Sequence, residues 1–213
     1  MTLSVVIPTL GHERSILGIA HQVCNQEDAG DLEVLLIFNP AASLSLSLRR
    51  QLESLDRRIR CFAIEKRGAN AARNAGIDLA RGKIILLLDD DCQLSDPHFL
   101  RKHLLLHETH PRHAVVGGTY RLPYVSDRIA KVYHQLQMDW LFSGLLAPAH
   151  FHERRTSDTS FLLGGNCSFK SKVFEFHRFD KSMTFGGTET ELFLRLRAEG
   201  WRQRSGIRPM ATL

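Results

Sequence analysis

The sequence predicts a single α/β domain of 213 residues, with a Rossmann-like, mostly parallel central sheet flanked by helices. In the first half of the chain, short apolar runs alternate with segments of helical periodicity, which is the order of an α/β fold. The runs are continuously apolar, as is typical of strands buried on both faces. The composition, 43% hydrophobic and 24% charged, is ordinary for one globular domain with a sizeable core.

Turn-forming residues punctuate the first half and give its elements their limits. Pro8 stops the first apolar run, Asn39-Pro40 stops the second, and Gly82 is placed to end a helix rich in small residues. The expected order is strand 3–8, helix 11–26, strand 33–38, helix 43–55, strand 59–64, helix 70–80 and strand 83–88.

The pattern weakens after residue 88. Gly117-Gly118 within an expected strand indicates a bulge or a close approach of backbones, and Gly200 ends the last helix. We expect a helix at 97–108, a strand at 114–120, an amphipathic segment at 128–141, a mobile polar loop at 147–160 that acts as a lid, an extended segment at 161–169 and a helix at 188–199. A division near residue 92 separates two halves of one domain, 1–92 and 93–213, and not two domains.

Composition also restricts the compartment and the class of partner. Lys and Arg number 28 against 23 Asp and Glu, and this net charge of +5 suits a phosphorylated ligand or an anionic membrane surface but is too weak to indicate nucleic acid. The aliphatic run Ile84–Leu88 is far short of the roughly 20 residues that span a bilayer, and residues 1–8 lack the pattern of a signal peptide. The four cysteines form no C-x-x-C pair. We therefore expect reduced thiols and a cytoplasmic protein, acting in solution or at the inner face of the membrane.

Three consecutive carboxylates, Asp89-Asp90-Asp91, follow directly after the strand at 83–88. Ligands of open α/β sheets bind outside the carboxyl ends of the strands. Clustered carboxylates repel one another, and Mg²⁺ or Mn²⁺ is the compensation that suits their oxygens. The alternative is a solvated acidic turn.

Three ordered blocks together resemble family 2 glycosyltransferases of the GT-A fold. They are the start SVVIPT at 4–9, the segment KRGANAARNAGIDLARG at 66–82 followed by the strand and its three Asp, and a C-terminal group. That group comprises GGNCSFK at 164–170, RFD at 178–180 and GGTETELFLRLR at 186–197. The resemblance covers about residues 3–204 and implies a nucleotide-sugar-binding half followed by an acceptor-binding half.

The resemblance also implies roles for individual residues. Asp91 and Asp89 would hold the divalent cation, Mn²⁺ or Mg²⁺, that bridges the donor diphosphate. The cation would stabilise the charge that develops on the nucleoside diphosphate as it leaves. The residues expected to contact the nucleotide sugar are Thr9, Asn39, Arg73, Asp89 and Asp90.

The family places an acidic pair before the last helix, and the second acid is its general base. This sequence has Thr188-Glu189 there, so Glu189 is the expected catalytic base. A local alternative exists for the neighbours, because Thr188 and Glu191 have the spacing of a helix capping box.

Two departures from the family pattern affect the expected site. The place of the acidic pair after the second strand holds Phe38-Asn39, where Asn39 can hydrogen-bond a base and Phe38 can only pack or stack. A His often follows the last strand, but no His follows His177, so His150 or His152 would substitute unless the sequence continues beyond Leu213. The residues expected on the acceptor side are Trp140, Gly165, Asn166 and Thr188.

The expected function is a metal-dependent, inverting transfer of a sugar from a nucleotide-diphosphate sugar to an acceptor hydroxyl. The acceptor would be a glycan or a lipid-linked molecule in cell-surface polysaccharide or glycoconjugate synthesis. Peripheral membrane association is compatible with such an acceptor, and no nucleic-acid partner is expected. The alternative is a degenerate transferase domain that binds a nucleotide or glycan without catalysis.

Overall fold

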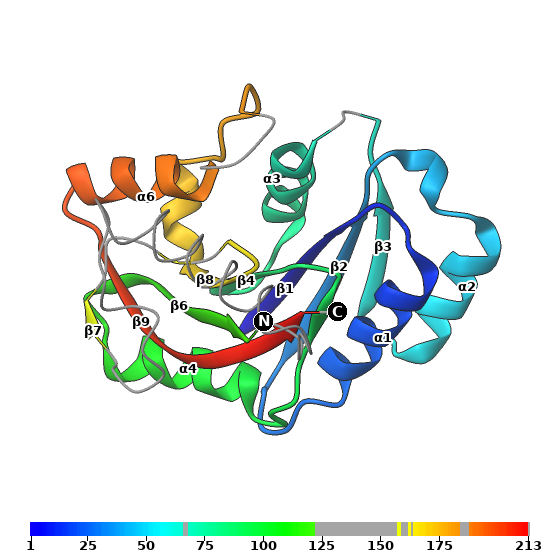
Figure 1. Cartoon of the computed structure of the whole chain (residues 1–213), viewed down its shortest axis with the longest axis horizontal. Helices are drawn as coiled ribbons and strands as arrows, with labels where there is room; N and C mark the ends of the chain where they lie inside the picture. The colour runs from blue at the N-terminus through cyan, green and yellow to red at the C-terminus, as the bar shows by residue number, and fades with distance from the viewer. Residues whose placement is uncertain (66–67, 122–156, 159–161, 163, 184–187, 213) are drawn as a thin grey trace, which may run out of the picture.

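The computed structural model describes residues 1–65, 68–121, 157–158, 162, 164–183 and 188–212. Within them it confirms the predicted α/β class, with one nine-stranded sheet that carries helices on both faces (Figure 1). The strand order is β3-β2-β1-β4-β8-β6-β9-β5, and β7 pairs with β9 off this path.

The strands that the apolar runs predict form the parallel half of this sheet. They are β1 (Leu3–Thr9), β2 (Leu32–Phe38), β3 (Ile59–Ala63) and β4 (Ile84–Leu88). In β1, β2 and β4 every side chain is buried or nearly so, because helices cover both faces. The carboxyl ends of these strands therefore meet at one edge.

Beyond β4 the sheet is mixed. β8 (Asn166–Lys170) runs antiparallel to β4 and to β6 (His113–Arg121), whereas β9 (Arg202–Thr212) runs parallel to β6. The short strands β5 (Cys92–Gln93) and β7 (Ser157–Asp158) pair antiparallel with β9. The two residues of β7 are the described part of the polar segment 147–160 that was expected to be a loop.

The helices divide between the two faces. α1 (Glu13–Cys24), α2 (Leu46–Leu55) and α4 (Phe99–Thr109) pack on one face; α3 (Ala69–Leu79), the 3₁₀ turn η2 (Ser171–Glu175) and α6 (Thr188–Ala198) pack on the other (Figure 1). A 3₁₀ turn, η1 (Ala41–Ser43), precedes α2, which begins later than predicted. The predicted amphipathic segment 128–141 lies outside the described residues.

Successive residues of one strand enter opposite cores. Val5 of β1 belongs to the core under α1, α2 and α4, and its neighbour Val6 belongs to the core under α3 and α6. All four cysteines are free thiols, as predicted, and burial raises the pKa of Cys61 to about 12. Across the described residues, no helix combines the length and the apolar character that crossing a bilayer would need.

Candidate active site

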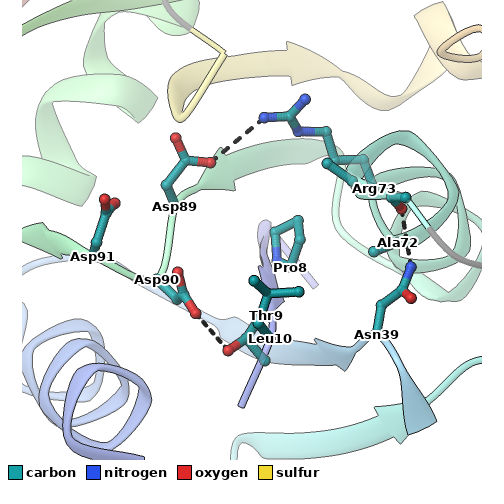
Figure 2. Close-up of a pocket in the computed structure, with 11 residues that line it drawn as sticks. Pro8, Thr9, Leu10, Asn39, Ala72, Arg73, Asp89, Asp90 and Asp91 are labelled. Carbon is teal, nitrogen blue, oxygen red and sulfur yellow. Dashed lines mark hydrogen bonds and ion pairs between the residues drawn. The ribbon is translucent and has the colours of Figure 1, made fainter. Parts of the chain in front are cut away.

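A pocket of about 310 Å³ opens at the carboxyl ends of β1, β2 and β4, beside the first turn of α3. Figure 2 shows Thr9 of β1 and Arg73 of α3 directed at the acidic segment that follows β4, and Asn39, just after β2, directed at the start of α3. The pocket is lined by Pro8, Thr9, Leu10, Asn39, Gly68, Ala69, Ala72, Arg73, Asp89, Asp90 and Asp91. All residues that the sequence predicts for the nucleotide sugar and the metal therefore lie at one pocket.

The three consecutive aspartates have different surroundings. Asp90 accepts a hydrogen bond from the Thr9 hydroxyl at 2.5 Å, and Thr9 Oγ1 in turn accepts one from the Gly11 amide at 2.9 Å. Asp89 lies 3.5 Å from Arg73 Nη2. Asp91 is exposed. Figure 2 shows Asp89 and Asp90 directed at different partners.

Arg73 connects this cluster to α6. Its Nη1 lies 2.7 Å from Glu189 Oε1, and both side chains are largely buried, at 11% and 19% exposed. The same nitrogen lies 3.5 Å from Thr188 Oγ1, and the guanidinium lies over the Phe179 ring, 5.6 Å from its centroid. The Arg73 guanidinium thus lies between Asp89, after β4, and Glu189, at the start of α6.

Two asparagines that we did not predict fix the helix that carries Arg73. The Asn74 carboxamide donates to Phe179 O at 2.8 Å and accepts from Phe179 N at 3.0 Å, and Asn70 Nδ2 donates to Asp180 O at 2.7 Å. Asn is a poor helix former whose side chain bonds readily to backbone groups. Two Asn one turn apart in an expected helix were therefore a signal that the sequence contained, although their burial and their partners are known only from the structure.

Glu189 rests against a glycine. A Cβ at Gly164 would lie 2.0 Å from Glu189 Oε1, so only glycine leaves room for the carboxylate. Gly165 and Asn166 continue this segment into β8 and are both buried. Thr188, at the first position of α6, is buried and adjoins Arg73. Three of the four residues predicted for the acceptor side thus lie near Glu189 in sequence or in space, and Trp140 lies outside the described residues.

The capping box is not the arrangement found at this helix. Glu191 pairs instead with Arg195 one turn later, with Arg195 Nη2 at 2.8 Å from Glu191 Oε2. Arg195 also donates to the Arg178 carbonyl at 2.7 Å. Glu191 therefore forms an ion pair within α6, whereas Glu189 forms one with Arg73 of α3.

The departures after β2 have plain structural consequences. Phe38 is fully buried in the core, so it packs and does not stack on a ligand. Asn39 lines the pocket and donates from Nδ2 to the Gly68 carbonyl at 3.0 Å, which ties β2 to the start of α3. His150 and His152 lie outside the described residues.

Metal-ligating side chains do not gather in threes within the part of the chain that the structure describes. Asp89 and Asp91 offer two carboxylates at the pocket. Mg²⁺ usually keeps several waters and takes one or two carboxylates together with substrate phosphates. This donor set therefore fits a cation shared with a bound diphosphate.

The fold is the GT-A fold of glycosyltransferases. TarS of S. aureus superposes on the whole chain with a TM-score of 0.74, at 13% identity and over 60% of the TarS chain. The mannosyltransferase PcManGT of Pyrobaculum calidifontis, in complex with GDP-Man and Mn²⁺, superposes on 96% of the chain with a TM-score of 0.68, at 18% identity and over 56% of its own chain.

The chain belongs to glycosyl transferase family 2, whose model matches residues 4–181. A curated relative is 32% identical over 94 residues, which are 43% of this chain: the GalNAc(5)-diNAcBac-PP-undecaprenol beta-1,3-glucosyltransferase of Campylobacter jejuni. The chain spans 30% of that relative's length.

Proposed function

We propose that this protein transfers a sugar from a nucleotide-diphosphate sugar to an acceptor hydroxyl, with inversion at the anomeric carbon. The observation that carries the proposal is the position of Arg73. It lines the pocket, pairs with Glu189 at 2.7 Å and lies 3.5 Å from Asp89, so one guanidinium adjoins both a candidate base and a candidate metal ligand. Family membership supports the same chemistry.

The donor would occupy the pocket at the carboxyl ends of β1, β2 and β4. Asn39 at the far side from the acidic segment would contact the base, and Thr9, Arg73, Asp89 and Asp90 would contact the rest of the nucleotide sugar. Asp89 and Asp91 would hold Mg²⁺ or Mn²⁺, and such a cation supplies charge stabilisation to the departing nucleoside diphosphate. TarS structures in complex with UDP and with UDP-GlcNAc support a nucleotide-sugar donor.

Glu189 would act as the general base of a direct displacement. As the bond from the acceptor oxygen to the anomeric carbon forms, the bond from that carbon to the diphosphate oxygen breaks. The hydroxyl proton passes to the Glu189 carboxylate, and the electron pair leaves with the nucleoside diphosphate. Arg73, which pairs with Glu189, would also donate to the diphosphate.

The acceptor would bind to the second half of the chain, residues 93–213, near Gly165, Asn166, Thr188 and Trp140. We propose a glycan or lipid-linked acceptor, cell-surface glycoconjugate synthesis and a cytoplasmic location that includes the inner face of the membrane. The undecaprenol-linked substrate in the name of the Campylobacter relative supports a lipid-linked acceptor.

Donor hydrolysis tests the proposal without a known acceptor. UDP-GlcNAc, UDP-glucose and GDP-mannose would each be incubated with the protein and Mn²⁺ or EDTA, with nucleotide release and a thermal-shift curve measured in parallel. We expect one donor to raise the melting temperature and to be hydrolysed with Mn²⁺ only. Binding without hydrolysis or transfer to any acceptor would favour the non-catalytic module. If no donor binds and none is hydrolysed, both the transferase and the non-catalytic module are rejected.

A further inference from the structure

Two buried histidines of α4 face β8 on the side of the sheet opposite Glu189. His103 Nδ1 lies 2.9 Å from Ser168 Oγ, and His103 Nε2 lies 3.2 Å from Asn166 Oδ1. His107, one helical turn later, places Nε2 3.0 Å from the same Ser168 Oγ. His103, Asn166 and Ser168 are each 0% exposed.

The hydrogen-bonding chemistry of these side chains gives this series of hydrogen bonds one direction. The carboxamide oxygen of Asn166 only accepts, so His103 Nε2 must carry the proton. In a neutral ring Nδ1 then accepts, so the Ser168 hydroxyl donates to it and takes its own hydrogen bond from His107 Nε2–H. Burial lowers the pKa of His103 to about 3 and that of His107 to about 4, which keeps both rings neutral.

The surroundings of His107 Nδ1 are consistent with that direction. The order leaves His107 Nδ1 as a bare acceptor, and this buried nitrogen has no hydrogen-bond partner among the described residues. With Asn166 Oδ1 facing His103 Nε2, each of the three hydrogen bonds in this series has one donor and one acceptor.

Asn166 in turn belongs to the segment that supports Glu189. A Cβ at Gly117 would lie 2.5 Å from Asn166 O, and one at Gly118 would lie 2.9 Å from Asn166 Nδ2, so two glycines of β6 make room for this residue. Asn166 directly follows Gly164-Gly165, and Gly164 is the residue against which Glu189 rests. It also pairs in register with Leu88, the residue before Asp89.

We propose that His103 is a positioning residue: by holding the Asn166 carboxamide in one orientation, it fixes the Gly164–Asn166 segment and thereby the carboxylate of Glu189. The placement of the segment rests on the geometry alone. Its consequence for turnover rests on the proposed function.

The first test reads the tautomers directly. Two-bond ¹H–¹⁵N spectra of the imidazole rings at pH 7 should show both His103 and His107 neutral with the proton on Nε2. A proton on Nδ1 of His103 would overturn the proposal, because Nε2 would then have no proton to give Asn166.

The second test compares two variants at one position with a matched variant of the same helix. His103→Leu removes the donor to Asn166, and His103→Gln keeps an amide N–H near the position of Nε2. His107→Leu removes a buried ring of the same helix whose hydrogen bond goes to Ser168. We expect His103→Leu to shift the backbone amide resonances of Gly165 and Glu189, with His103→Gln close to wild type and His107→Leu intermediate or silent. Equal shifts in His103→Leu and His107→Leu, or none in His103→Leu, would reject the assignment.

Turnover then tests the consequence. With Mn²⁺ and whichever of the three donors the wild-type protein hydrolyses, His103→Leu should lower the kcat of hydrolysis about 10-fold to 100-fold at unchanged donor KM, since small displacements of a reacting group cost that much. His103→Gln should restore most of it. An unchanged kcat alongside shifted resonances would reject the link to Glu189. A wild-type protein that hydrolyses no donor would reject the proposed function, and the two spectroscopic tests would still decide the placement. If His103→Leu does not fold, the wild-type tautomers and His103→Gln decide it.

Discussion

Replacing Glu189 by Gln tests the proposed base with the least change in shape. Gln has the same length but cannot take a proton, so turnover should fall on the order of 10²-fold to 10⁴-fold. The donor Kd should be unchanged or lower, because Arg73 loses its partner at 2.7 Å and becomes more available to a diphosphate. A loss in kcat with no loss in donor affinity is the signature of a group that acts in the chemical step.

The cost in stability follows from the contacts that survive. Arg73 keeps Asp89 at 3.5 Å and its position over the Phe179 ring, and a Gln carbonyl still accepts a hydrogen bond. Only the charge-assisted part of one bond is lost, and the difference between charged and neutral hydrogen bonds is about 1 kcal/mol. Thermal melts should therefore show a folded protein with a small decrease in the free energy of unfolding.

Glu191→Gln is the matched control, because it makes the same change two residues along the same helix. Glu191 pairs with Arg195 on a half-exposed surface, away from Arg73, so activity should be retained and the stability loss should stay below about 1 kcal/mol. Both variants need steady-state donor hydrolysis, UDP affinity by calorimetry and melting curves. Normal turnover in Glu189→Gln with an inactive Glu191→Gln would show that we assigned the base to the wrong carboxylate, and normal turnover in both would place the base elsewhere.

Three further predictions concern the metal, the glycine under Glu189 and the buried histidines. Asp91→Asn should remove the Mn²⁺-dependent part of UDP affinity and leave the melting temperature nearly unchanged; equal affinity with Mn²⁺ and with EDTA in both proteins would contradict the metal role. Gly164→Ala should lower kcat like Glu189→Gln, because the new methyl would lie 2.0 Å from the carboxylate oxygen and displace it; wild-type kcat would show that Glu189 does not act from this position. The pKa values of His103 and His107, lowered by burial, lie below those of the unfolded chain, so their stabilisation is complete above about pH 6.5 and is lost as the pH falls towards 4. Urea unfolding should show that the free energy of unfolding falls by roughly 2 kcal/mol per histidine from pH 7 to pH 5, and by less in His103→Gln. The same pH dependence of stability in both proteins would contradict the lowered pKa of His103.

The part of the fold that the sequence predicts well is the part in which burial on both faces leaves a simple signal. β1, β2 and β4 are continuous apolar runs, and each was located to within a residue or two. β9 gave no such signal, because Arg202, Gln203 and Arg204 open it with polar side chains, and its place beside β6 depends on long-range pairing. Its pairing partner did carry a signal: Gly117-Gly118 was predicted to mark a bulge or a close backbone approach. The pairing with β9 shifts register between these two glycines, and a Cβ at Gly118 would lie 2.4 Å from the Ile207 carbonyl.

The candidate site divides in the same way. The sequence brings Thr9, Asn39 and the three aspartates to one edge, because parallel strands end together. It does not reveal that Arg73 reaches α6, since Arg73 and Thr188 are 115 positions apart and meet only after β8 inserts antiparallel beside β4.

The partners of the side chains that support Arg73 and Glu189 were also beyond local reasoning, for a physical reason that is the same in each case. Asn74 has its partner at Phe179, and His103 has its partners at Ser168 and Asn166, so each partner lies 63 to 105 positions away in the sequence. The sequence does not identify the hydrogen-bond partner of a polar side chain in a helix, and the burial of that side chain is known only once the sheet is assembled. Because an unpaired buried polar group costs about 1–3 kcal/mol, each such residue had to meet a partner. In this protein the partners are Phe179, whose ring lies under Arg73, and the start of β8, which follows the Gly164 that contacts Glu189.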